Sequence, residues 1–359
     1  VVIPDAPPSL RSAYLKFTPN TSTDWPCLGV AAFAELEGDG TCRSLEIIFG
    51  SVTEIPFRVP GVPEMAAGRG LDNALIDEIA EKGECDFVTD IAAPFPLKII
   101  CDMMGIAPDR YDEVFNHSNV VLSQGDPEYI PEDVNPLEAL LGAGAGLAAI
   151  MHETADARRG GDGQDLTSLL VNAEVDGERL TSDELASFFV LLCVAGNETT
   201  RNAISWGLHY LTENPDQRAV WLADIDGVTP TAVEEIVRMA SPVTHFRRTV
   251  TTDGVRLGGH EFKVGEKVVL WYNSANRDEA VFDDPDRFDV RRDPNPHVGF
   301  GGPGPHFCLG AHLARREVGV MFRHLLTRLP DIRSTAEPDL LRTNFVNGIK
   351  HLPCAWTPA

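Results

Sequence analysis

The sequence predicts a mainly α-helical protein with a small β region, and three observations support this. From Leu71 onward, apolar residues recur three or four positions apart, which is the period of an amphipathic helix. The segment from Thr181 to Asn214 contains no proline and could form about 50 Å of helix at about 1.5 Å per residue. After Pro242, alternating patterns typical of strands run between Arg248 and Trp271.

The first seventy residues differ in character from the rest. Pro, Gly, Ser and Thr separate short apolar runs such as Leu45 to Phe49, and no helical period persists. We therefore expect loops and short strands in residues 1–70. Residues 71–359 should form the main helical region, and together the two parts should make one domain.

The helical segments that precede the long one are bounded by proline and glycine. They are Leu71 to Lys82, Phe87 to Met104 with a division at Pro94 and Pro96, Tyr111 to Leu122, Gly142 to Thr154, and Asp165 to Glu174. None of them carries evident chemistry, so we expect them to be packing elements.

The long helix begins with a Thr-x-x-Glu capping box at Thr181 and Glu184. Its first half is apolar nearly all round, which predicts burial. Its middle, Ala195 to Thr200, combines a glycine with side chains that compete for backbone hydrogen bonds, so the helix is locally weak there. This segment is either a kink that holds water or a solvent-exposed turn.

Composition indicates a chain with ample material for a core, working in a reducing compartment. The 359 residues are 43% hydrophobic, and the seven cysteines form no Cys-x-x-Cys pair. The N-terminus lacks the basic start and apolar run of a signal peptide, and the longest apolar run, Leu185 to Gly196, is too short to span a bilayer. We therefore expect a cytoplasmic protein with no transmembrane anchor.

The formal net charge of −24 at pH 7 repels nucleic acid and anionic membranes, so neither is an expected partner. Basic residues nevertheless gather in one part of the chain. They are Arg291, Arg292, His312, Arg315, Arg316 and Arg323. Two interpretations are open: a solvated helix face, or a docking patch for an acidic partner protein.

The most specific pattern runs from Phe300 to Arg316. Prolines stiffen this loop and glycines make it compact, so it presents Cys308 at a fixed point before a helix that starts near Leu309. Free amides and the helix dipole would stabilise a thiolate there. A single thiolate under a flat apolar surface is the arrangement that binds haem iron, and Gly310 leaves room for it.

This loop has two other interpretations. A phosphate-binding loop needs free amides and a Gly-Lys-Ser/Thr ending, whereas here prolines remove two amides and no lysine follows. A buried structural cysteine is the other alternative, because free cysteine is among the most buried residue types.

The pattern Phe300-Gly-Gly-x-Gly-x-His306-x-Cys308-x-Gly310 resembles the haem-binding signature of the cytochrome P-450 monooxygenases, in a form with one extra residue before the histidine. Ala195 to Thr200 resembles the family's Ala-Gly-x-Asp/Glu-Thr-Thr oxygen-activation motif in register. The resemblance covers about residue 71 to the end. It implies the cytochrome P-450 fold, a single large helical domain with a small β region.

The resemblance also implies the chemistry. Haem b would be bound through the thiolate of Cys308 as the axial ligand of the iron. A ferredoxin-type electron donor with its reductase would supply electrons, and one oxygen atom of O2 would enter an unactivated C–H bond of a hydrophobic small molecule. Glu198 and Thr199 would supply protons, as the positioned relay that general acid chemistry needs.

Further residues receive roles from the resemblance. The haem contacts would be Ala195, Gly196, Arg248, Phe300, His306 and Gly310, with Arg248 and His306 on the propionates. The substrate pocket would be lined by Val243, Thr244, His245 and Val346. A buried network of Glu235, Arg238 and Arg287 would brace the cysteine loop. By themselves, Glu235 and Arg238 would be an ordinary surface ion pair and Arg248 an ordinary strand arginine.

The N-terminal part departs from the family. Relatives carry an early helix with a His-x-x-x-Arg pattern on a haem propionate, preceded by a loop over the substrate pocket, and here no histidine precedes His117. A divergent region, a truncated chain and a reading-frame error could each explain this, and we favour one of the last two.

Within the family, residues 99–105, 194–201 and 271–278 look most like bacterial enzymes that hydroxylate sterol side chains or methyl-branched lipids. A terpenoid hydroxylase, a peroxide-using hydroxylase and a non-catalytic haem-thiolate binder remain as alternatives.

Overall fold

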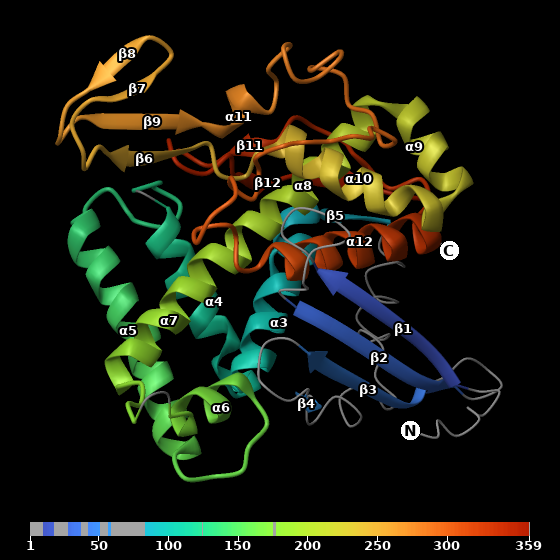
Figure 1. Cartoon of the computed structure of the whole chain (residues 1–359). Coiled ribbons are helices and arrows are strands. Elements are labelled where there is room, and N and C mark those ends of the chain that lie inside the picture. Colours follow the sequence, from blue (N-terminus) through green and yellow to red (C-terminus); the bar gives the residue numbers. More distant parts are fainter. Residues whose placement is uncertain are drawn as a thin grey trace, which may run out of the picture. The chain divides into compact units, whose positions relative to one another are not determined.

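The structure is a computed structural model that describes strands at residues 10–17, 28–36, 42–50 and 57–58, and residues 83–358 except 124, 175 and 176 (Figure 1). It divides into two compact units, residues 1–78 and 79–359. The sequence predicted a single domain with a change of character near residue 70.

The first unit contains an antiparallel sheet with the strand order β1-β2-β3-β4. Its strands are β1 (Leu10–Phe17), β2 (Leu28–Leu36), β3 (Cys42–Gly50) and β4 (Phe57–Arg58). In the first ladder, Leu10 pairs with Glu35 and Phe17 with Leu28. The prediction of strands is confirmed, although β1 to β3 are longer than the short strands expected. The helix predicted from Leu71 to Lys82 lies outside the described residues.

The second unit is mainly helical, as predicted. Its helices are η1 (Val88–Ala92), α3 (Pro94–Met104), η2 (Pro108–Arg110), α4 (Tyr111–Leu122), α5 (Pro136–Arg158), α6 (Leu166–Asn172), α7 (Ser182–Leu192), η3 (Cys193–Asn197), α8 (Glu198–Glu213), α9 (Pro215–Ala223), α10 (Ile225–Ala240), α11 (Tyr272–Ala275) and α12 (Ala311–Arg328). Pro94 begins α3, so the predicted division at proline is confirmed. Helix α5 starts earlier than predicted because the Asn135 side chain caps it.

One helical rod runs from α7 through η3 to α8. Thr181 begins it with the predicted capping box: its hydroxyl accepts the Glu184 amide at 3.2 Å, and the Glu184 carboxylate accepts the Thr181 amide at 2.8 Å. In the middle, η3 forms one π-helical turn, an irregularity that often marks functional sites. The rod ends at Asn214, directly before Pro215.

Two buried apolar clusters hold this rod in place. The larger one unites α8, α10 and α12, and in it the Trp221 and Phe322 rings lie 5.2 Å apart. Gly207 permits the close approach of α8 and α12, since a Cβ there would lie 2.6 Å from Phe322. The second cluster joins α3, α4, α5 and α7 around Met104 and Phe189. In Figure 1, α12 (orange-red) accordingly lies beside α10 (yellow).

Small sheets complete the second unit, as predicted. Their strands are β5 (Glu84–Asp86), β6 (His245–Thr249), β7 (Val255–Leu257), β8 (His260–Phe262), β9 (Lys267–Trp271), β10 (Arg333–Ser334), β11 (Asp339–Leu340), β12 (Ile349–His351) and β13 (Pro353–Ala355). They pair in the orders β10-β13-β5, β11-β12, β6-β9 and β7-β8. Across the described residues, no helix combines the length and apolar character needed to cross a bilayer.

Candidate functional site

The cysteine loop delivers one sulfur to the start of α12. Gly301 and Gly304 have φ angles of 87° and 138°, which favour glycine. The Cys308 amide donates to the Phe300 carbonyl at 3.0 Å and closes the loop. The Gly310 amide hydrogen-bonds the Cys308 sulfur. Cys308 is exposed. It lies shortly before a helix, as the sequence predicted, although α12 begins at Ala311 and not near Leu309.

The surroundings of this sulfur favour a thiol rather than a thiolate when nothing else is near. Partial burial raises the pKa of Cys308, while the Gly310 amide and Arg315 act in the opposite direction. Beside it, the apolar side chains of Phe307 and Leu309 are 42% and 81% exposed. A cation at the sulfur would favour the thiolate, and an apolar group would cover the exposed side chains.

Arg248 and His306 line one cavity of about 960 Å³. Arg248 belongs to β6 and His306 to the cysteine loop, so two distant segments supply cationic or hydrogen-bonding groups to the same space. The remaining wall comes from β9, α11 and the loop that carries Gly301 to Pro305. Such a pair suits an anionic group of a ligand.

The predicted oxygen-activation segment forms η3 and the start of α8. The Thr199 hydroxyl donates to the Ala195 carbonyl at 2.7 Å, across the π-helical turn. Ala195 is exposed, and Gly196 faces α3, because a Cβ on Gly196 would lie 2.9 Å from Ile100. A side chain at Gly196 would therefore displace the end of the Ile100 side chain, and the predicted role of Gly196 over an iron stays a prediction.

Glu198 is buried, with 1% of its surface exposed. Arg201 Nη2 donates to its carboxylate in a buried ion pair, and Asn202 Nδ2 donates to the same oxygen at 3.0 Å. Arg201 Nη1 reaches Asn119 of α4 at 3.0 Å. The Nε of Arg201 and both polar side-chain atoms of Asn197 are buried without a hydrogen-bond partner in the described part of the chain. This polar cluster therefore retains unused hydrogen-bonding capacity.

A second buried carboxyl group lies on α12, and no motif marks it in the sequence. Glu317 is 4% exposed and hydrogen-bonds Thr200, while its Oε1 has no partner among the described residues. Burial raises the pKa of Glu317 to about 8, although the bond with Thr200 acts in the opposite direction. The side chain is therefore neutral at pH 7. Its only signal in the sequence is an acid among the apolar residues of α12.

The predicted pocket residues come together from distant segments. Val243 and Val346 pair as an isolated β-bridge, and the Thr244 amide donates to the Phe345 carbonyl at 2.9 Å. The His245 ring meets Phe345 edge-on at 6.0 Å. Val346 is buried at 4% exposure, whereas Val243, Thr244 and His245 are half-buried. The last three are thus better placed to contact a ligand than Val346.

Glu235 and Arg238 form a completely buried pair on α10, both side chains being 0% exposed. Arg238 Nε and Nη2 donate to the carboxylate at 2.7 and 2.8 Å. Its Nη1 donates to the carbonyls of Asn276 and Pro285, both at 2.7 Å. This arrangement ties α10 to the segments before the cysteine loop.

The third predicted member, Arg287, does not bring its side chain to this network. Arg287 is exposed and contributes only its carbonyl oxygen, which accepts from Arg238 at 3.0 Å. Arg292 supplies the second guanidinium instead, with its Nε 3.2 Å from Glu235. Phe288, the residue after Arg287, is buried, whereas the side chain of Arg287 lies in solvent.

Glu234, next along α10, makes a further brace that the sequence did not indicate. Arg315 of α12 donates to it twice, at 2.5 and 2.9 Å, and its guanidinium covers the Phe300 ring at 4.3 Å. His297 Nε2 lies 2.8 Å from the same carboxylate. Burial opposes ionisation, but the bonds from His297 and Arg315 lower the pKa of Glu234 to about 2.

The basic residues near the cysteine loop are partly neutralised. Arg292 and Arg315 serve the two braces just described, and Arg323 pairs with an aspartate of α10 at 3.2 Å. Arg291 and Arg316 are exposed. Half of the six basic residues therefore already have carboxylate partners.

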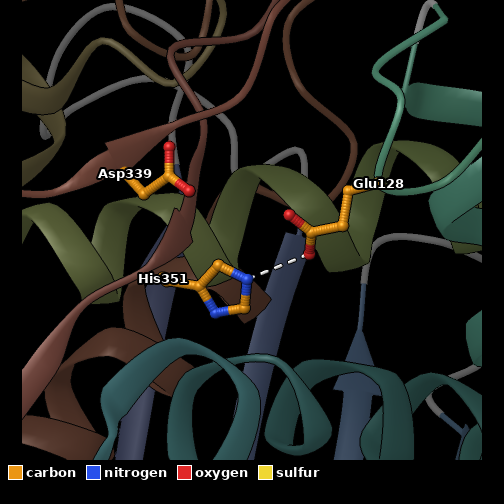
Figure 2. A group of neighbouring side chains, drawn as sticks. All are labelled: Glu128, Asp339 and His351. Atoms are coloured by element: carbon orange, nitrogen blue, oxygen red, sulfur yellow. Dashed lines mark hydrogen bonds and ion pairs between the residues drawn. The ribbon is translucent and has the colours of Figure 1, made fainter.

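A separate charged cluster could hold a metal ion by spacing alone. Figure 2 shows Glu128 bonded to His351 at 3.0 Å with Asp339 nearby, and one ligand atom from each lies within 4.8 Å of the others. However, the Lys350 ammonium lies 3.2 Å from Glu128 and 3.6 Å from Asp339. His351 also contacts Asp86 at 2.6 Å. Because a lysine already supplies the cation, we interpret this cluster as structural.

Comparison with family models gives two matches on different parts of the chain. The model described as Cytochrome P450 matches residues 147–347, and the model described as CO dehydrogenase flavoprotein C-terminal domain matches residues 13–94. The first match lies within the second unit, and the second match begins in the sheet of the first unit.

Individual members of the cytochrome P450 family also match most of this chain. The chain is 52% identical over 274 residues to the methyl-branched lipid omega-hydroxylase of Mycobacterium tuberculosis, covering 76% of this chain and 63% of the relative. It is 40% identical to the steroid C26-monooxygenase of Mycolicibacterium smegmatis, covering 78% and 63%. The chain thus spans about 63% of the length of these curated relatives.

Solved structures agree. Mycobacterium marinum cytochrome P450 CYP268A2 in complex with pseudoionone matches with a TM-score of 0.75 and 46% identity, covering 79% of this chain and 68% of the other. CYP109E1 from Bacillus megaterium in complex with corticosterone matches with a TM-score of 0.72 and 32% identity, covering 79% and 75%. The predicted fold is therefore confirmed for the second unit.

Proposed function

Since this chain belongs to the cytochrome P450 family, we propose that it is a haem-thiolate monooxygenase that hydroxylates an unactivated C–H bond of a hydrophobic small molecule. The single observation that carries the proposal is the cysteine loop. It presents the Cys308 sulfur at the start of α12, with the Gly310 amide on the sulfur.

The residues present fit a haem. Members of the family bind haem through a cysteine thiolate. Cys308 is exposed, and because its pKa is raised, a bound cation such as iron would favour its thiolate form. The exposed Phe307 and Leu309 suit an apolar macrocycle, and a Cβ on Gly310 would meet nothing within 4 Å. Arg248 and His306 would hold the propionates, as they line one cavity. When bound, the haem supplies the oxidising chemistry.

Residues of the helical rod α7-η3-α8 would transfer protons to the site. The Thr199 hydroxyl donates its hydrogen bond to the Ala195 carbonyl. The hydroxyl oxygen of Thr199 is therefore free to accept a hydrogen bond from a group in the site. Glu198 would carry a proton on its carboxylate between the polar cluster and Thr199. Arg201 and Asn202 hold that carboxylate, so a rotation of Glu198 away from them would accompany each transfer.

For the substrate, we favour a methyl-branched lipid or a sterol side chain. The relatives named methyl-branched lipid omega-hydroxylase and steroid C26-monooxygenase support this choice, at 52% and 40% identity. Val243, Thr244 and His245 would contact the substrate. The solved relative that holds pseudoionone supports a smaller branched molecule, such as a terpenoid, as the alternative.

The electron donor would be a ferredoxin-type protein, which its reductase reduces and which passes electrons to this chain. O2 would be the second substrate of this chain. Its acidic surface would meet the exposed Arg291 and Arg316. The engaged guanidinium groups of Arg292 and Arg315 would contribute mainly by holding the cysteine loop. We propose the cytoplasm as the location, where such donors occur.

Residues 1–78 would form a domain of another family. The match of residues 13–94 to the CO dehydrogenase flavoprotein C-terminal domain and the division at residue 78 support this. We propose a composite chain as a further explanation, beside the divergent, truncated and misread regions named above. Limited trypsin digestion of the whole chain should leave a stable fragment of the second unit.

Turnover tests the proposed activity directly. The haem-loaded chain is supplied with NADH, a surrogate ferredoxin and its reductase, together with a methyl-branched lipid, a sterol or a terpenoid. We expect a hydroxylated product from one of these, with an oxygen atom derived from O2. Haem binding without product from any of them would favour the non-catalytic haem-thiolate binder. Product with hydrogen peroxide alone would favour the peroxide-using alternative.

A further inference from the structure

Two cysteines at opposite ends of the second unit meet in one small sheet. Cys85 of β5 and Cys354 of β13 have their sulfur atoms 3.5 Å apart, although 269 positions separate them in the chain. Cys354 is 2% exposed and Cys85 is half-buried. The site described above uses neither of them.

The backbone places these two residues directly opposite each other. The register pairs Cys85 with Cys354 and Asp86 with Pro353 in antiparallel strands. Two residues away, the Phe87 amide donates to the Leu352 carbonyl at 2.9 Å. Because hydrogen-bonded pairs alternate along an antiparallel ladder, the cysteines occupy a hydrogen-bonded position, where Cα atoms are about 5.5 Å apart. That separation is close to the commonest value for a disulfide, about 5.5 to 6 Å.

We propose that Cys85 and Cys354 form a reversible disulfide in the presence of a low-molecular-weight disulfide. The bond needs the sulfur atoms to approach by about 1.5 Å, from 3.5 Å to the S–S bond length of about 2.05 Å. The bond would join the first described strand of the unit to its last strand. It would therefore act as a redox-controlled clamp on the whole second unit.

The reaction proceeds by two exchanges. The Cys85 thiolate attacks one sulfur of the small disulfide, one half leaves as a thiolate, and the other half remains on Cys85. The sulfur of Cys354 then attacks Cys85, loses its proton to the solvent, and displaces the second half. Two protein thiols are oxidised, and one small disulfide is reduced to two thiols.

The residues around Cys85 determine the rate of this reaction. The hydrogen bond with Cys354 and burial raise the pKa of Cys85, and the charges of Asp90 and Asp86 act in the same direction. The thiolate is therefore scarce at neutral pH, and oxidation requires an excess of the small disulfide and a long exposure. Reduction by an excess of small thiol reverses it.

A linkage map of the unchanged chain tests the proposal. The whole chain is incubated with oxidised glutathione or, as the reduced sample, with dithiothreitol, and free thiols are then blocked with iodoacetamide. Trypsin cuts after Lys82, Lys98 and Lys350 give peptides 83–98 and 351–359, each with one cysteine. We expect these two peptides to be linked in the oxidised sample and separate after reduction.

The chain supplies a matched internal control. Cys101 and Cys193 are also neighbours, since the charge of Cys101 influences the pKa of Cys193, but both are 0% exposed. Their tryptic peptides, 99–110 and 180–201, should stay unlinked because the small disulfide cannot reach either thiol. Blocked Cys85 and Cys354 at equal yield in both samples would overturn the proposal. So would glutathione that stays on Cys85, or a link between peptide 83–98 and a cysteine other than Cys354.

Thermal unfolding gives a second readout. Closing a loop of 269 positions restricts the unfolded chain, so the oxidised protein should unfold several degrees above the reduced one. In Cys354→Ser the two samples should unfold at the same temperature. An equal rise in this variant would show that the effect arises from another thiol and would contradict the clamp.

Discussion

Two glutamate–arginine pairs of identical spacing lie buried on α8 and α10, and they differ in how completely they are bonded. On α10, Arg238 donates to both oxygens of Glu235 and to three carbonyl groups. On α8, Arg201 donates to Glu198 and to Asn119, and its Nε has no partner in the described part of the chain.

The difference shows what separates a brace from a site. A fully bonded buried pair holds one geometry, because every rearrangement leaves a charged group without partners. A pair with unused donors next to it can exchange partners at lower cost. In the proposed function, α10 would therefore hold the cysteine loop and α8 would move protons. Removing members of each pair can break this assignment.

The largest expected effect is on turnover, in the α8 pair. Glu198→Gln keeps the shape and the hydrogen bond from Asn202 but cannot carry a proton. We expect kcat to fall by about 100- to 10,000-fold, the usual range for loss of a general acid. The exposed Glu213 at the end of the same helix gives the control Glu213→Gln, which should keep the parent rate. A loss below tenfold in Glu198→Gln would place the proton route elsewhere.

The next effect is on stability, in the α10 pair. Arg238→Ala leaves Glu235 buried without its main partner and should lower the free energy of unfolding by about 3 to 5 kcal/mol. Denaturant titration measures this. Arg287→Ala is the matched control, since its exposed side chain lies outside the network, and should change stability by less than about 0.5 kcal/mol. Equal losses in the two variants would restore Arg287 as a member.

A smaller effect is expected where α4 supports the α8 pair. Asn119→Ala removes the acceptor of Arg201 Nη1 and should cost about 1 to 3 kcal/mol of unfolding free energy. Asn116 lies one turn earlier on α4 and is exposed, so Asn116→Ala should be neutral within about 0.5 kcal/mol. Neutral behaviour of both variants would mean that solvent replaces the lost acceptor.

The last effect depends on pH and concerns Glu317, a buried carboxyl without an arginine partner. The unfolded chain releases this proton near pH 4.5 and the folded chain near pH 8, so the folded state binds more protons in between. As the pH rises through this window, the free energy of unfolding should therefore fall by up to about 1.4 kcal/mol per pH unit. In Glu317→Gln this dependence should disappear, whereas Glu213→Gln should keep the parent profile. An unchanged slope in Glu317→Gln would contradict the raised pKa.

The sequence predicted those parts of the fold and the site that depend on local patterns. The capping box at Thr181, the proline start of α3 and the position of Cys308 before α12 all follow from neighbouring residues, and the structure confirms them. Family resemblance added the pairing of Arg248 with His306, which share one cavity.

What the sequence did not predict depends on the direction of side chains and on distant contacts. Arg287 and Arg292 are equally basic, and only the turn between them decides which one reaches Glu235. The environment of Glu317 depends on Thr200, more than a hundred residues earlier. A second family model matches residues 13–94, and the strand periodicity of the first seventy residues did not indicate this match.

The central claim is that Cys308 binds haem iron as a thiolate in a chain that spans about 63% of its curated relatives. The most direct test is the absorption spectrum of the haem-loaded, dithionite-reduced protein under carbon monoxide. We predict a strongly red-shifted Soret band for the parent chain and loss of that band in Cys308→Ser. A Soret band typical of a neutral axial ligand with Cys308 intact, or no haem uptake at all, would contradict the claim.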